Sequence, residues 1–148
     1  NLPDIGLTPL AIGSGAAAAA GASGLSSLFN STLKALLAAT DLADTDLELD
    51  TFDLFGLLHN AVSNPSAYGF TNVTDPCLDV ATGTQCADPD SYLFWDNFHP
   101  TAAAHRLIAQ TAFSAIPEPS ALLLFTLALM ALLRFCPSPR NTKKVCTI

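Results

Sequence analysis

The sequence predicts a layered α/β fold with an incomplete sheet, followed by a C-terminal transmembrane helix. Three observations support this prediction. Apolar residues recur at helical spacing in three segments before residue 114, only one segment alternates polar and apolar residues like a strand, and one uncharged apolar run stands near the C-terminus. Because one strand is too few to complete a sheet, we expect the chain to hold part of a layered domain.

The first forty residues are predicted to pass from an irregular segment into a helix. The chain begins Asn1-Leu-Pro-Asp-Ile, with no initiator Met and no leader, so we expect its N-terminus to be a cut end. Residues 13–24 are Gly, Ala and Ser, and we interpret them as a surface loop or a loosely helical insert. Helical spacing begins behind Ser26 or Ser27 as N-cap and continues to about Ala43.

The middle of the chain is predicted to be strand, helix, loop and helix. Residues 46–52 alternate in the period of a strand, and Asp53 can cap a short amphipathic helix that Asn64-Pro65 ends. His59 on that helix is interpreted as a structural or surface histidine. Residues 64–94 hold many turn formers and are predicted to be a long irregular loop. A closing helix over residues 101–113 follows, with Pro100 at or near its first position.

The four cysteines form a close pair, Cys77 and Cys86, and a tail pair, Cys136 and Cys146. The close pair bounds a short loop rich in Asp, Pro, Thr and Gly, which favours a disulfide in an oxidising compartment over a zinc site. Such a disulfide contributes about 2.5 to 3 kcal/mol on the chain-entropy model. Two unpaired thiols are the alternative. No pattern gives the tail pair a role.

The C-terminal segment is interpreted as a membrane helix with a basic tail. Thirteen uncharged residues, 121–133, span about 20 Å as a helix, which is short of the ~30 Å hydrocarbon core. Residues 120–136, with Arg134 reaching the interface, give about 25 Å, which is marginally enough. A buried core helix is the alternative. Four of the six basic residues lie at 134–144, so the predicted disordered tail, 135–148, would stay cytoplasmic and the body would be exported.

The charge distribution excludes one class of partner. The chain carries a formal net charge of −7, and Lys34 and Arg106 are the only basic residues before position 134. An acidic body of this kind cannot neutralise a row of phosphates. We therefore expect no nucleic-acid partner.

Asp96 and His99 are the candidate catalytic pair. A serine hydrolase needs an imidazole to take the serine proton and a carboxylate to hold that imidazole in the right tautomer. An Asp three residues before the His can reach its Nδ1 if the backbone turns sharply between them. From the spacing alone, a capping Asp beside a surface His remains an alternative. A metal site of Asp96, His99 and His105 is another, although a His-x-x-x-His spacing is absent.

The flanking residues resemble those of a known family. Phe94-Trp-Asp-Asn-Phe-His-Pro-Thr101 is similar to the last block of the SGNH/GDSL esterases and lipases, Asp-x-x-His-Pro, in the form that secreted phospholipase-like and haemolysin-like members often show. Other segments match the family in order over about residues 1–115: Asn1 to Pro9, Phe29-Asn30 with Leu33, Asp50, Asn64-Pro65, Tyr68-Gly-Phe70, Cys77-Leu78 and Cys86-Ala-Asp88.

This resemblance implies the C-terminal part of a three-layer α/β/α SGNH-hydrolase domain, at 1–115. It implies that His99 is the general base and Asp96 its orienting acid, with no cofactor and no metal. The family's nucleophilic Ser and two oxyanion-hole residues belong to blocks that precede the part beginning at Asn1. Ser14 and Ser23 do not meet the Gly-x-Ser-x-Gly pattern. We therefore expect this chain alone to be inactive.

Pro117-Glu118-Pro119, an apolar run and then Arg134 resemble the PEP-CTERM sorting signal of exported proteins of Gram-negative bacteria, which an exosortase is thought to process. The resemblance places this signal at 116–134. The predicted protein is an exported bacterial hydrolase of lipid or other acyl esters, anchored at least transiently in the membrane by residues 120–136. The alternative is a non-catalytic, surface-anchored binding or matrix protein with a hydrolase-like fold.

Overall fold

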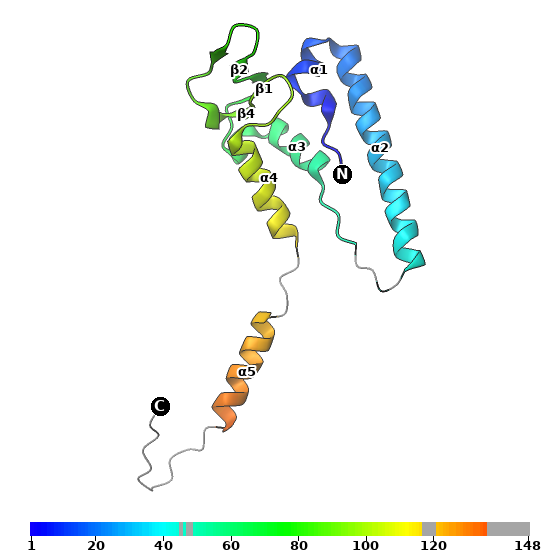
Figure 1. The fold of residues 1–148 in the computed structure, drawn as a ribbon, viewed down its shortest axis with the longest axis vertical. Coiled ribbons are helices and arrows are strands. Elements are labelled where there is room, and N and C mark those ends of the chain that lie inside the picture. The colour runs from blue at the N-terminus through cyan, green and yellow to red at the C-terminus, as the bar shows by residue number, and fades with distance from the viewer. Residues whose placement is uncertain (45, 47–48, 117–120, 136–148) are drawn as a thin grey trace. The chain divides into compact units, whose positions relative to one another are not determined.

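The structure is a computed structural model, which describes residues 1–44, 46, 49–116 and 121–135, the last range with side chains at 124–132. The chain divides after Ile116 into two units (Figure 1). The first unit mixes helices and strands, as the predicted α/β class requires.

The first unit begins with a short 3-10 helix, η1 (Ile5–Leu7), and two helices, α1 (Pro9–Gly13) and α2 (Ala16–Ala43). The prediction of a loop or loose insert at 13–24 was wrong, because α2 is a continuous helix from Ala16. Alanine has the highest helix propensity, and an interior glycine costs only about 1 kcal/mol relative to it. Five consecutive alanines therefore outweigh Gly21 and Gly24.

The segment before η1 runs along α2 and is fastened to it. Asn30 in α2 accepts a hydrogen bond from the Leu2 amide (2.8 Å) and donates one to the Leu2 carbonyl (2.9 Å). The Ser26 hydroxyl is buried and accepts from the Ile5 amide (3.2 Å). Ser26 was predicted as an N-cap and is instead an interior residue of α2, whose N-cap position is Gly15 at φ 100°.

Helix α3 (Leu54–Ser63) confirms the predicted capped helix. The Asp53 carboxylate accepts from the Gly56 amide (2.9 Å), and the Asn1 side chain accepts from the Leu54 amide (2.7 Å). Two side chains thus satisfy the free amides at the start of the helix. Asn64 ends it, as predicted.

The predicted strand at 46–52 was wrong over its described part, since residues 49–53 have no regular structure, while residues 47 and 48 lie outside the described residues. A strand needs a neighbour for its backbone groups. The hydrogen bonds to the Phe52 carbonyl come instead from the amino group of Asn1 (3.1 Å) and the Leu54 amide (3.2 Å).

The long loop predicted at 64–94 was only partly right, because it carries short elements. They are η2 (Pro65–Tyr68), β1 (Asn72–Pro76), β2 (Leu78–Asp79), β3 (Thr84–Gln85), η3 (Pro89–Ser91) and β4 (Tyr92–Phe94). β1 and β4 pair in parallel, and β2 and β3 pair antiparallel. The predicted disulfide between Cys77 and Cys86 is confirmed.

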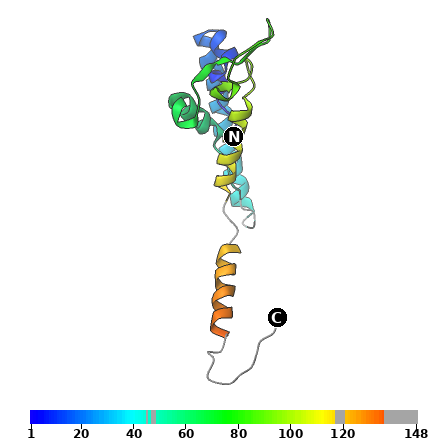
Figure 2. The ribbon, with the colours of Figure 1, turned by 90° about the vertical axis from the view of Figure 1, so that its left-hand side faces the viewer.

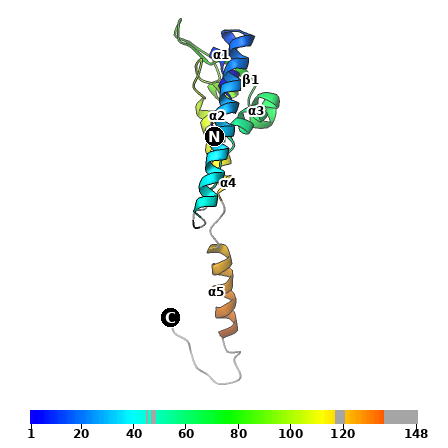
Figure 3. The ribbon, with the colours of Figure 1, turned by 90° about the vertical axis from the view of Figure 1, so that its right-hand side faces the viewer.

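Helix α4 (Ala102–Ala115) closes the first unit. It begins two residues after Pro100, which lies near the first helical position, as predicted, and pairs with Phe94 in an isolated antiparallel bridge. The core lies between α3, β4 and α4 and consists of Ala61, Phe70, Leu93, Phe94 and Ala104. Edge-on views show α3 standing out on one face of the layer that contains α2 and α4 (Figures 2 and 3).

The second unit contains α5 (Ala121–Phe135), which confirms a helix in the apolar run. Among the described residues, however, no helix combines the length and hydropathy needed to cross a membrane. The predicted membrane span at 120–136 is therefore not supported. The sorting motif Pro117-Glu118-Pro119 and the tail from 136 onward, with Cys136 and Cys146, lie outside the described residues.

Candidate active site

The predicted pair lies at the tip of a tight turn between β4 and α4. The Trp95 amide donates to the His99 carbonyl (2.7 Å), and the Thr101 amide donates to the Leu93 carbonyl (3.0 Å). These two bonds, with the Phe94–Pro100 bridge between them, close the segment into a hairpin. The sharp backbone turn that the chemistry requires between Asp96 and His99 is therefore present.

The Asp96 carboxylate organises this tip. Its Oδ1 accepts from the backbone amides of His99 (2.7 Å) and Phe98 (2.8 Å). Burial raises the pKa of Asp96, but the amides of His99 and Phe98 and then the imidazole outweigh it and hold the pKa below its usual value. Asp96 is therefore a carboxylate at neutral pH.

The imidazole of His99 is held by the same carboxylate. Its Nδ1 lies 2.8 Å from Oδ2 and 3.1 Å from Oδ1 of Asp96. Because a carboxylate only accepts hydrogen bonds, Nδ1 carries a proton, and in the neutral imidazole Nε2 is then the nitrogen with the lone pair. Nε2 makes no hydrogen bond within the described part of the chain, and the His99 side chain is 71% exposed against 22% for Asp96. This is the geometry of an oriented general base.

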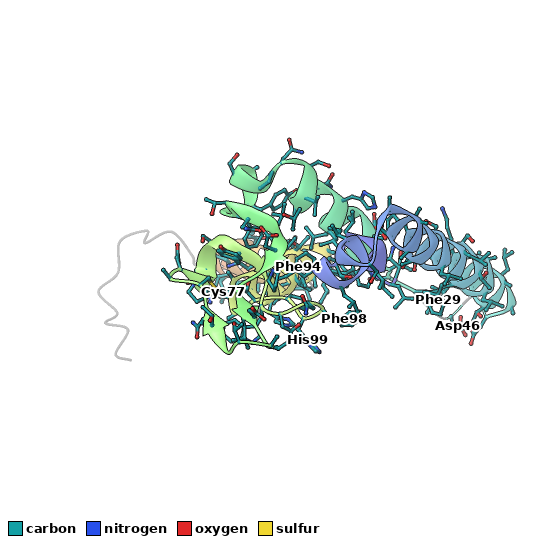
Figure 4. All side chains as sticks on the ribbon, turned by 90° about the horizontal axis from the view of Figure 1, so that it is seen from above. Phe29, Asp46, Cys77, Phe94, Phe98 and His99 are labelled. Atoms are coloured by element: carbon teal, nitrogen blue, oxygen red, sulfur yellow. A yellow bond between two sulfur atoms is a disulfide. The ribbon has the colours of Figure 1, made fainter. Side chains whose placement is uncertain are left out.

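Two other segments of the first unit hold the hairpin. The Leu10 amide of α1 donates to the Asn97 carbonyl (2.9 Å) at the tip. Beside the disulfide, the Cys77 amide donates to the Phe94 carbonyl (3.0 Å) and the Leu78 amide to the Trp95 carbonyl (2.6 Å). Phe98 and His99 lie next to each other, with Phe94 farther inside (Figure 4).

A second histidine–aspartate pair was not predicted. His59 Nε2 lies 2.8 Å from Oδ2 of Asp4, whose other oxygen accepts from the Gly6 amide (2.9 Å). Asp4 is 2% exposed, and the pair ties η1 to α3. No sequence signal could have found it, since the two residues lie 55 positions apart. His59 is thus structural, as the sequence indicated.

An apolar pocket of about 180 Å³ lies beside His99. Its walls come from η1 and the residues beside it, α3, the hairpin and α4, and include Ile5, Leu58 and Leu107. Part of this lining is the core of the first unit, and we assign the pocket no ligand.

The structure brings together Asp96 and His99 but not the other candidates. The Ser14 hydroxyl donates to the Leu10 carbonyl (2.7 Å), an intrahelical bond, and Ser23 lies against Gly6. His105 lies on exposed surface of α4. Among the described residues, no group of three His, Cys, Asp or Glu side chains could hold a metal ion.

Residues 1–112 match the model of the family described as GDSL-like Lipase/Acylhydrolase. The chain belongs to this family. A GDSL esterase/lipase of Arabidopsis thaliana is 34% identical over 98 residues, which are 60% of this chain and 27% of the relative. Another, GDSL esterase/lipase 7, is 35% identical over 101 residues with the same coverage.

A bacterial protein is similar over a shorter range. The thermolabile hemolysin of Vibrio parahaemolyticus is 36% identical over 73 residues, which are 40% of this chain and 18% of the hemolysin. The resemblance to GDSL enzymes is thus confirmed at the level of the family. The chain spans at most 27% of the length of these relatives.

Proposed function

We propose that this chain supplies the acid and the base of a serine esterase site, in a protein that hydrolyses carboxylic esters by an acyl-enzyme route. The proposal rests on the Asp96–His99 pair, in which the Asp96 carboxylate holds His99 Nδ1 while His99 Nε2 is free to accept a proton. In the proposed reaction, His99 Nε2 takes the proton of a serine hydroxyl as the serine attacks the ester carbonyl, and then returns it to the leaving alcohol. Water deacylates the serine with the same base.

The nucleophile of this proposal lies outside the chain, as the family's order of sequence blocks implies. Among the described residues, the Ser14 hydroxyl donates to the Leu10 carbonyl, Ser23 lies against Gly6, and no hydrogen bond joins either serine to His99. The oxyanion-hole donors lie outside it as well, and the whole domain is proposed to be a three-layer α/β/α fold of which this chain is the C-terminal part. The parallel pairing of β1 and β4 supports that view, since parallel strands occur almost only in sheets covered by helices. The chain alone is therefore proposed to be inactive.

The decisive test replaces His99 in the complete protein. His99→Ala should lower turnover of a short acyl ester such as p-nitrophenyl butyrate by about 10³-fold or more, since triad members act as a unit. His105→Ala is the matched control, because this histidine is exposed on α4, and it should leave turnover unchanged.

Two outcomes contradict the proposal in different ways. Undiminished turnover by His99→Ala would show that another group is the base. No turnover of acyl or lipid esters by the unaltered complete protein would favour the alternative, a non-catalytic surface protein with a hydrolase-like fold.

We also propose that the protein is exported from a bacterial cell and that Pro117-Glu118-Pro119 begins a PEP-CTERM signal. In this proposal, residues 120–136 hold the protein at the membrane until an exosortase processes the signal. The Cys77–Cys86 disulfide supports export, because such bonds persist in oxidising compartments. In exported protein, both thiols should resist alkylation until reduced, and the intact mass should show loss of the C-terminal segment. Freely alkylated thiols would argue against export, and an intact mass without loss of the C-terminal segment would argue against processing.

A further inference from the structure

Thr101 joins the two arms of the hairpin that carries Asp96 and His99. Its side chain is buried, with the residue 1% exposed. Its hydroxyl donates to the Tyr92 carbonyl (2.7 Å) and accepts from the Ala104 amide (3.2 Å). Its own amide donates to the Leu93 carbonyl (3.0 Å). One residue thus binds the start of β4, the next residue of β4 and the first turn of α4.

The hydroxyl does what no apolar side chain can do. A threonine hydroxyl donates one hydrogen bond and accepts others at the same time. Here it donates across the hairpin and caps the helix with the same oxygen. Valine has nearly the same shape but would leave the Tyr92 carbonyl and the Ala104 amide without these partners.

His99 depends on this fixation because little else holds its ring. The His99 side chain is 71% exposed, so packing does not set its position, and its ring is tied to the protein by the Asp96 carboxylate and an edge contact with Phe98. Asp96 and Phe98 lie on the same hairpin. The ring therefore follows the hairpin backbone, whose base is closed at Thr101.

We propose that Thr101 is a positioning residue, whose hydroxyl sets the placement of His99 Nε2 through the base of the hairpin. This inference rests on the proposed function, in which Nε2 takes the serine proton. Displacing a catalytic group by a fraction of an ångström slows the chemical step while it leaves substrate binding largely intact.

The test compares three variants of the complete protein. Thr101→Val removes the hydroxyl, and Thr101→Ser keeps it while removing the methyl group. Thr111→Val is the matched control, because the Thr111 hydroxyl lies on the same helix, is partly buried and donates to the Leu107 carbonyl (2.8 Å) away from the hairpin. Thermal unfolding of each variant identifies any loss of the folded state.

With p-nitrophenyl butyrate, Thr101→Val should lower kcat by about tenfold or more and leave KM within about twofold, as expected for a displaced catalytic group. Thr101→Ser and Thr111→Val should keep kcat. An unchanged kcat in Thr101→Val would overturn the proposal, and so would an equal loss in Thr101→Ser, which retains the hydroxyl.

A second readout does not need ester hydrolysis. The pKa of the Asp96 carboxyl, followed by NMR, reports the amide bonds of the hairpin tip. The pKa of Asp96 should rise in Thr101→Val and remain unchanged in Thr101→Ser and Thr111→Val. If it rises while the unaltered protein hydrolyses no ester, the positioning of the hairpin stands and the proposed function fails. If it does not rise, the hairpin does not depend on Thr101.

Discussion

The charge state of Asp96 is decided by a few amide groups. Two backbone N–H groups and one imidazole N–H point at the same carboxylate, and each of these bonds favours the ionised form over the neutral one. The turn is consequently more stable while Asp96 is ionised. Asp96 and His99 are in this sense one structural unit.

The acid sensitivity of the turn follows from this pKa. A carboxyl whose pKa is lower in the folded state stabilises that state above its unfolded pKa, near 3.9, and the stabilisation is lost as pH falls through the folded pKa. The side-chain carboxyl carbon of Asp96, followed by NMR, should therefore show protonation of this group only below the usual range of an Asp carboxyl. Asp96→Asn should abolish that acid transition. Protonation of the Asp96 carboxyl above its usual pKa would contradict the assigned geometry.

The candidate pair could be predicted from sequence because its interactions are local. The hydrogen bonds that orient His99 come from residues three positions away or fewer, and Thr101 completes the same short segment. By contrast, the contacts of Asp4 with His59 and of Leu10 with Asn97 join residues far apart in the chain. Only the folded arrangement brings those partners together.

Helices and strands also divide into those that local contacts define, which could be predicted, and those that depend on distant partners, which could not. Helix α3 was predicted because Asp53 caps it through a bond to an amide three residues on, and α4 because its apolar residues recur at helical spacing. The strand expected at 46–52 depends on a neighbour that the sequence pattern does not show. The short strands β1 and β4 were missed for the same reason, since their parallel pairing is set by partners and not by their own alternation.

The extent of α2 reflects its packing against η1. Gly6 has no side chain, and a Cβ there would meet the Ser23 hydroxyl and the Ala19 carbonyl of α2. Small residues on both sides therefore let the backbones approach closely. A tract that was interpreted as a loop because of its small residues is helical, and those residues form its contact surface.

Two glycine substitutions should act in opposite directions. Gly6→Ala should lower the free energy of unfolding by about 1 to 3 kcal/mol, because α2 has to move away. Gly24→Ala lies in the interior of α2 with open space around it and should raise that free energy by about 0.5 to 1 kcal/mol. Thermal unfolding followed by circular dichroism measures both. Equal effects of the two substitutions would contradict the close approach at Gly6.

For the whole molecule, the charge distribution limits the partners of the first unit. Up to Ile116 the chain has eleven aspartates and one glutamate against Lys34 and Arg106. Such a body repels polyanions at moderate salt. A neutral acyl ester meets no such barrier on its way to His99, which agrees with the proposed substrate class.

The site and its supports all belong to the first unit, Asn1–Ile116. The hydrogen bonds that build the hairpin connect residues from Leu10 to Ala104, and the disulfide lies between them in sequence. A chain that ends at Ile116 should therefore unfold within about 3 °C of the full-length chain, a difference of less than about 1 kcal/mol. The pKa of Asp96 should not change on truncation. Gly6→Ala in the same assay supplies a destabilised reference, and a loss of stability on truncation as large as that of Gly6→Ala would show that the second unit supports the first.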